Sequence, residues 1–82
     1  SDLISYLFDI AMNCIQNNEL EIKAIQDECV FEIAIFISQG IENIDRMKYD
    51  TLKLILKRYQ GSIKIIHENQ NINISLLIPV SR

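Results

Sequence analysis

Apolar and polar positions follow two different periods along this chain of 82 residues. Near its start, apolar residues recur every four positions, at Leu3, Leu7, Ala11 and Ile15. This spacing places side chains on one face of a helix. The pattern predicts a helix over residues 3–17, with an asparagine pair at 17–18 as its stop.

The next segment changes to a period of two, which is typical of half-buried strands. Leu20, Ile22 and Ala24 alternate with charged residues, and a polar turn at 26–28 follows. A second alternating set then lies at Phe31, Ile33, Ile35 and Ile37. Residues 20–37 are therefore predicted to form a β-hairpin.

The second half of the chain repeats the order of helix and hairpin. Residues 38–48 are polar and lack a steady period, so they are expected to connect the two halves. A helical repeat follows at Leu52, Ile55, Leu56 and Tyr59, and Gly61 stands where a left-handed residue would end that helix.

The last part of the chain predicts a second hairpin. Ile63 and Ile65 begin a third strand, residues 68–71 form its turn, and Pro79 ends the pairing of the fourth strand. The fourth strand has apolar residues at every second position, namely Ile72, Ile74, Leu76 and Ile78.

These elements predict one domain, residues 1–82, of the α+β class. Its order is α-β-β-α-β-β, in a two-layer sandwich with both helices on one face of a mixed or antiparallel sheet. A chain of this length buries only about 60% of its unfolded surface on folding. Its stability is therefore expected to be marginal without a partner.

Charge and composition exclude several classes of function. The net charge is −3, whereas nucleic-acid binding needs a concentrated basic face. This segment contains no run of about 18 apolar residues that could span a membrane. Cys14 and Cys29 lie in different elements without metal-type spacing to His67, so both are expected to be reduced core residues, which favours the cytoplasm.

Two segments resemble the histidine-kinase-type (Bergerat or GHKL) ATPase domain of two-component sensor kinases and related histidine phosphotransfer proteins. In that family a helix ends in Gly-Gly-x-Ile before one strand and a final alternating strand that stops at proline. Here Gly61-Ser62-Ile63 and the strand ending at Pro79 resemble that pattern. Leu7-Phe8-Asp9-Ile10-Ala11 is similar to the Leu-x-x-Asn-Ala of the family's first helix.

The resemblance implies that nucleotide binding has been lost. Ile10 stands in place of the asparagine that helps to hold magnesium, and an aliphatic side chain offers no oxygen ligand. Ser38, followed by Gly40, stands in place of the aspartate that binds adenine. The glycines that approach the phosphates fall on Arg46 and Lys48. We therefore expect no cofactor, no metal and no catalytic residue.

The expected function is a non-catalytic interaction or scaffolding module of a bacterial two-component phosphorelay. Its partner would be a response regulator or a second copy of the chain. One sheet face should be uncovered by helices and hence polar, yet apolar residues alternate onto it. These candidate interface residues are Val30, Ala34, Phe36, Ile66 and Leu77. The alternative is that they merely extend a small core around the strand edges.

Two other functions remain open from the residues. The element order is also a rotated form of the ferredoxin-like order, which suits a small-ligand-sensing regulatory domain. Neighbouring parallel strands would favour that alternative. The third possibility is an ATPase with substituted ligands, in which Arg46 and Lys48 attract phosphate through their side chains.

Overall fold

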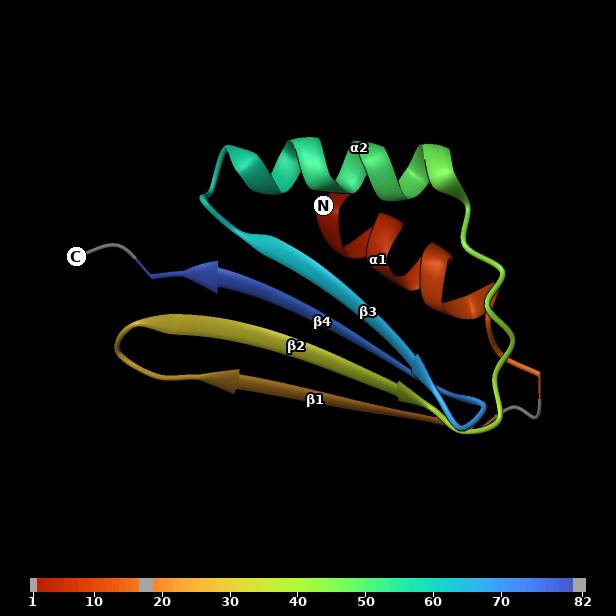
Figure 1. Ribbon diagram of the computed structural model, residues 1–82. Coiled ribbons are helices and arrows are strands. Elements are labelled where there is room, and N and C mark those ends of the chain that lie inside the picture. The colour runs from red at the N-terminus through yellow and green to blue at the C-terminus, as the bar shows by residue number, and fades with distance from the viewer. Residues whose placement is uncertain (1, 17–18, 81–82) are drawn as a thin grey trace.

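The computed structural model describes residues 2–16 and 19–80. It confirms the α+β class and the predicted element order, with both helices on one side of a four-stranded sheet (Figure 1). The elements are α1 (Asp2–Met12), β1 (Leu20–Gln26), β2 (Val30–Ile37), α2 (Arg46–Lys57), β3 (Ser62–Glu68) and β4 (Asn71–Pro79).

The sheet has the order β1-β2-β4-β3, and every neighbouring pair is antiparallel. Two hairpins are thus joined through β2 and β4, which leaves β1 and β3 at the edges. The register places Ile22 opposite Ile35, Ile35 opposite Ile74, and Ile74 opposite Ile65. No two neighbouring strands of the described sheet are parallel. The parallel strands β2 and β3 are joined by α2 and separated by β4, which is a split βαβ unit, so this topology also fits the ferredoxin-like alternative.

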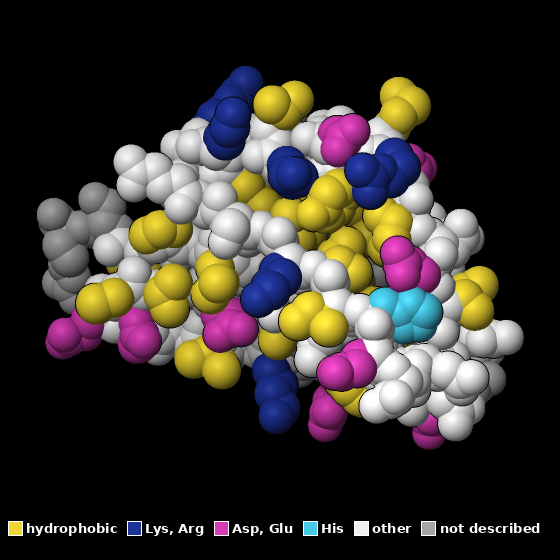
Figure 2. Space-filling view, viewed as in Figure 1, with side chains coloured by type: hydrophobic (Ala, Val, Ile, Leu, Met, Phe, Trp, Pro, Cys, Tyr) yellow, Lys and Arg dark blue, Asp and Glu magenta, His cyan; other side chains and the backbone are white. Residues whose placement is uncertain are grey.

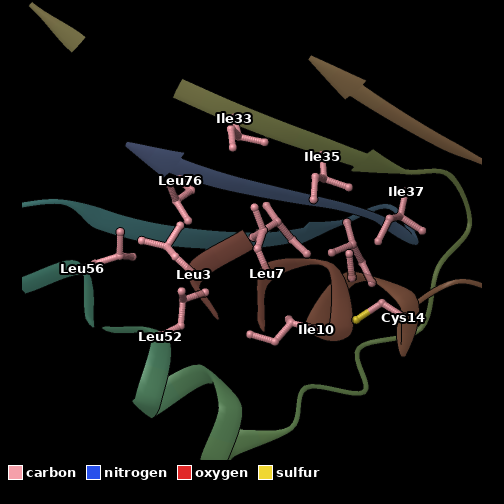
Figure 3. Packing of buried hydrophobic residues seen from close by; sticks show 13 residues of the cluster. Leu3, Leu7, Ile10, Cys14, Ile33, Ile35, Ile37, Leu52, Leu56 and Leu76 are labelled. Carbon is pink, nitrogen blue, oxygen red and sulfur yellow. The ribbon is translucent and has the colours of Figure 1, made fainter. Parts of the chain in front are cut away.

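The core lies between the two helices and one face of the sheet (Figure 3). Its side chains are aliphatic apart from the Cys14 thiol, and no polar side chain of the described residues is buried. The largest fully buried members are Leu7, Ile10, Cys14, Ile35, Ile37, Leu52, Leu56, Ile72, Ile74 and Leu76. The predicted helix and strand faces therefore meet as the periodicity requires.

The first helix is shorter than its apolar stripe. Regular α-helix ends at Met12, and the next turn tightens, since the Cys14 N–H donates to the Ala11 carbonyl oxygen at 3.0 Å. The Cys14 carbonyl oxygen accepts the Ile41 N–H at 2.9 Å instead of a later helical N–H. The loop after β2 thus uses a carbonyl that a longer helix would need. The predicted stop at 17–18 lies outside the described residues.

The second helix begins inside the segment predicted as a loop. The Asp45 side chain accepts the Lys48 N–H at 3.3 Å, so Asp45 is the N-cap and the helix starts at Arg46. An aspartate followed by good helix formers is a recognisable start signal. The apolar stripe alone missed it because the first turn has no buried side chain, and Met47 in that turn is 81% exposed.

The predicted left-handed conformation of Gly61 is wrong. The residue with positive φ is Gln60, at 58°, and its N–H donates to the Lys57 carbonyl oxygen. The Gly61 N–H donates to the Leu56 carbonyl oxygen at 2.8 Å, which completes a Schellman motif. Gly61 is instead required by packing, because a Cβ there would lie 2.6 Å from the Leu77 carbonyl oxygen.

Strand β1 lacks the cover that the other three strands receive. All seven of its residues are exposed, although Leu20 and Ile22 share the sheet face with the core residues of β2. Two other expected core residues, Cys29 and Tyr59, are also exposed. Cys29 lies in the turn between β1 and β2, and Tyr59 lies beyond the last residue of α2.

Candidate functional site

Ile10, which the sequence resemblance places at the position of a magnesium-binding asparagine, is completely buried. Figure 3 shows its side chain near Leu52, between α1 and α2. A buried aliphatic side chain at this position stabilises the helix pair by apolar burial, typically by about 1.5–3 kcal/mol. The position serves the core and presents no ligand atom to a cation.

Ser38 and Gly40 lie in the loop that follows β2. Ser38 is half-buried, and Gly40 is buried beneath the end of α1. A Cβ on Gly40 would lie 2.7 Å from Ile37 Cγ2 and 2.8 Å from the Cys14 carbonyl oxygen. Gly40 therefore permits the close approach that lets the next N–H bond to Cys14, and its φ is not positive.

Arg46 and Lys48, which the sequence resemblance places at phosphate-binding glycines, stand at the start of α2. Lys48 Nζ pairs with Asp9 Oδ2 of α1 at 3.2 Å, and Arg46 Cζ lies 5.6 Å from the centre of the Tyr49 ring. The Asp45 carboxylate already caps the helix N-terminus, and its charge opposes a phosphate there. Because both partners of the Asp9–Lys48 pair are partly exposed, the pair contributes about 0–1 kcal/mol.

Polar chemistry elsewhere is sparse. Within residues 2–16 and 19–80, no three His, Cys, Asp or Glu side chains gather closely enough to hold a metal ion. His67 lies in β3, and its Nδ1 is 2.9 Å from Glu42 Oε1, beside a polar hollow of about 450 Å³. This pair joins the loop after β2 to the end of β3. The same two side chains also line a smaller hollow of about 180 Å³ together with Arg46 and Tyr49.

The sheet face without helices carries all five predicted interface residues. Phe36 and Ile66 are 38% and 44% exposed and flank Asn73 in one row across the sheet. The remaining three are half-buried, namely Val30, Ala34 and Leu77. Their placement on one face is thus as predicted.

These five residues do not form a continuous apolar patch. Ala34 lies between Lys23 and Ser75 in its row, and Leu77 lies between Glu32 and Ser62. Polar and apolar side chains therefore alternate across the open face. The two most exposed of the five are Phe36 and Ile66, near the end of the sheet where β2 finishes.

A second apolar surface, which the sequence analysis missed, lies on the helix side of β1. Leu20 and Ile22 of β1 are exposed there, beside α1. Ile10 lies between α1 and α2, and Phe8 lies two positions before it, about 200° around the axis of α1. Phe8 is therefore on the side of α1 that faces away from α2. Phe8 and Met12 are both exposed on this flank. We call these four residues the β1 ledge.

A groove runs along the opposite edge of the sheet, between α2 and β3. Figure 2 shows hydrophobic side chains in a hollow there, with Lys and Arg side chains along its rim. One section has a volume of about 520 Å³ and is lined by Lys53, Leu54, Lys57 and Ile63 among others. A smaller section of about 180 Å³ reaches Ile65. We call this the α2–β3 groove.

Charge is segregated between the two edges. Residues 19–32, which include β1, carry five Asp or Glu and one Lys, for a net charge of −4. Residues 46–64, which include α2 and the first three residues of β3, carry six Lys or Arg and one Asp, for a net charge of +5. The near-neutral total therefore conceals an acidic edge and a basic edge.

Comparison with known proteins found no family model that matches the chain and no curated protein that matches it significantly. Among the described residues, no helix is long and apolar enough to cross a membrane.

Proposed function

We propose that the domain is a non-catalytic protein-interaction module, and that it acts as a scaffold in a bacterial two-component phosphorelay in the cytoplasm. The observation that carries the interaction role is the exposure of Phe36 and Ile66 on the helix-free face of the sheet. Phe36 and Ile66 lie on either side of Asn73, and an exposed aromatic side chain can become the buried anchor of a protein interface. The partner class, a response regulator, comes from the kinase-like motifs of the sequence.

The loss of nucleotide binding is supported by what the substituted positions do in the fold. Ile10 is buried in the core, Gly40 packs against α1, and Lys48 pairs with Asp9. Each position therefore has a structural role that leaves no side-chain oxygen for magnesium.

Partner binding can be tested with Phe36→Glu against receiver domains of response regulators. In the interface, the glutamate carboxylate would lose its hydration without gaining a counter-charge. The dissociation constant should therefore rise about thirtyfold, equivalent to roughly 2 kcal/mol. Ile41→Glu is the matched control, because Ile41 is similarly exposed but lies in the loop before α2. Circular dichroism checks the fold of both variants, and equal affinities would contradict the proposed surface.

Nucleotide binding is tested separately by titration calorimetry with Mg-ATP and Mg-ADP. We expect no specific binding tighter than about 100 μM, which corresponds to roughly 5.5 kcal/mol. Tighter binding that Lys48→Ala or Arg46→Ala abolishes would contradict the loss of nucleotide binding. It would instead favour the ATPase with substituted ligands.

A further inference from the structure

We infer that copies of this chain associate head to tail, with β1 of one copy added to the β3 edge of the next, beneath α2. The β1 ledge and the α2–β3 groove are the two halves of this interface. The inference concerns the sheet edges and does not depend on the proposed binding of a response regulator at Phe36.

The free edge of β3 has backbone groups available for another strand. Asn69 and Gln70 both have positive φ and form a two-residue turn, so Glu68 and Asn71 are a hydrogen-bonded pair. Hydrogen-bonded pairs occur at every second residue. The N–H and C=O groups of Ile63, Ile65 and His67 therefore point away from β4. Within the described chain, no backbone group outside the sheet bonds to these three residues.

The free edge of β1 has the matching pattern. The Asp27 N–H donates to the Val30 carbonyl oxygen at 3.0 Å, and hydrogen-bonded pairs alternate from that point along the hairpin. The backbone groups of Leu20, Ile22 and Ala24 therefore point outward. Their side chains lie on the helix side of the sheet, as does that of Ile63. A pair such as Ile22 opposite Ile63 can thus exchange both backbone hydrogen bonds with the two side chains on one face.

Strand direction also agrees with this docking. The four strands alternate in direction across the order β1-β2-β4-β3, so β1 and β3 run in opposite directions. A second copy displaced within the plane of the sheet, without being turned over, brings its β1 antiparallel to β3. Both sets of helices then lie on the same side. Such a contact joins two different surfaces and can repeat from copy to copy.

Docking supplies the cover that β1 lacks within one chain. With Ile22 of the second copy opposite Ile63, its Leu20 lies opposite Ile65 and enters the α2–β3 groove. The exposed Leu54 on α2 then faces the β1 ledge of that copy. Burial of such apolar surface favours association.

Charge identifies the occupant as another copy of this chain. The groove edge carries a net charge of +5 over residues 46–64, whereas the hairpin that contains β1 carries −4 over residues 19–32. In the same register, Glu21 of the second copy lies opposite Lys64 on the helix-free face. Cross-strand pairs of opposite charge stabilise a sheet, and complementary patches favour one orientation of approach.

Sedimentation velocity over about 10 μM to 1 mM tests the association, a range chosen to span weak affinities. We expect the average mass to grow past that of a dimer as concentration rises. Ile22→Lys and Leu54→Lys should each weaken association about tenfold or more, because each places a charge in the interface. Ile25→Lys is the control. Ile25 is exposed on β1, but its side chain lies on the helix-free face. In this register it also lies beyond the first residue of β3.

Mixing the two variants tests the head-to-tail arrangement. Ile22→Lys leaves the groove intact, and Leu54→Lys leaves β1 intact. At a concentration where the wild-type chain is half associated, each variant alone should therefore be mostly monomeric, whereas a 1:1 mixture should form a dimer that does not grow. The amides of Ile63 and Ile65 should become protected from hydrogen exchange in that dimer.

A wild-type chain that stays monomeric at 1 mM would overturn the inference, as would a dimer of Leu54→Lys alone. Phe36→Glu should leave self-association unchanged, which separates this inference from the proposed function.

Discussion

The two hairpins have similar alternating sequences but very different surroundings. In the first, Ile22 of β1 is 45% exposed, whereas its register partner Ile35 on β2 is completely buried. In the second, β3 is also an edge strand, yet Ile63 and Ile65 are half-buried beside α2. The difference shows that alternation determines the face of a side chain, while the position of the helices determines whether that face is covered.

The turns of the two hairpins differ as well. In the first, the Asp27 carboxylate accepts the N–H groups of Cys29 and Val30 at 2.7 and 2.8 Å. In the second, Asn69 and Gln70 both adopt positive φ without a glycine. One turn is thus stabilised by a side-chain acceptor, and the other holds a glutamine in a conformation that favours glycine.

The largest expected effect compares Ile35 with Ile22, which lie opposite each other on the same face. Ile35→Ala should lower the free energy of unfolding by about 2–5 kcal/mol, because it leaves a cavity in the core. Ile22→Ala should change it by only about 0.5 kcal/mol, as for other exposed positions. Urea unfolding at low protein concentration measures both values. Similar losses would mean that β1 is covered within the single chain.

The next effect concerns the start of the second hairpin. Gly61→Ala should cost about 1–3 kcal/mol, because the added methyl group would meet the Leu77 carbonyl oxygen at 2.6 Å and Leu56 Cδ2 at 3.0 Å. Gln60→Ala is the neighbouring control and should change stability little, since neither residue type favours positive φ. Thermal unfolding of both variants checks the comparison. A neutral Gly61→Ala would refute the close packing of β3 against α2.

A smaller, opposite effect is expected in the second turn. Gln70→Gly should raise the free energy of unfolding by about 1 kcal/mol, because it relieves the left-handed conformation at φ 65°. Gln26→Gly, at the end of β1, should instead lower stability by about 0.5–1 kcal/mol, since glycine weakens a strand. Chemical denaturation of the two variants distinguishes the turns. The same sign of change in both would contradict this interpretation of Gln70.

The smallest effect concerns the pH dependence of the first turn. The N–H groups of Cys29 and Val30 lower the pKa of Asp27 below its ordinary value. The stability from this carboxylate is therefore present above the ordinary pKa of aspartate, about 4, and is lost as the pH falls through the lowered value. Asp27→Asn should be slightly less stable than wild type at pH 7, and the difference should disappear in acid. A difference independent of pH would exclude the carboxylate charge as its cause.

The spacing of apolar residues was enough to predict the elements and their faces. The four-residue period of Leu3, Leu7 and Ala11 and the two-residue period of Ile33, Ile35 and Ile37 specify which side chains share a face, because backbone geometry sets both periods. The five predicted interface residues reached the helix-free face for the same reason. Local hydrogen bonding near Cys14 and Asp45 moved the helix ends, which apolar spacing does not report.

Which of those faces are covered, and which glycines serve packing, depends on how the elements are arranged in space. Leu20, Ile22 and Ala24 have the pattern of a core strand. The two helices nevertheless pack over the other strands, so the residues of β1 are exposed. The close contacts of Gly40 and Gly61 involve groups from elements distant in the chain. Burial and close approach depend on the relative positions of whole elements, and a period along one strand contains no information about what packs above it.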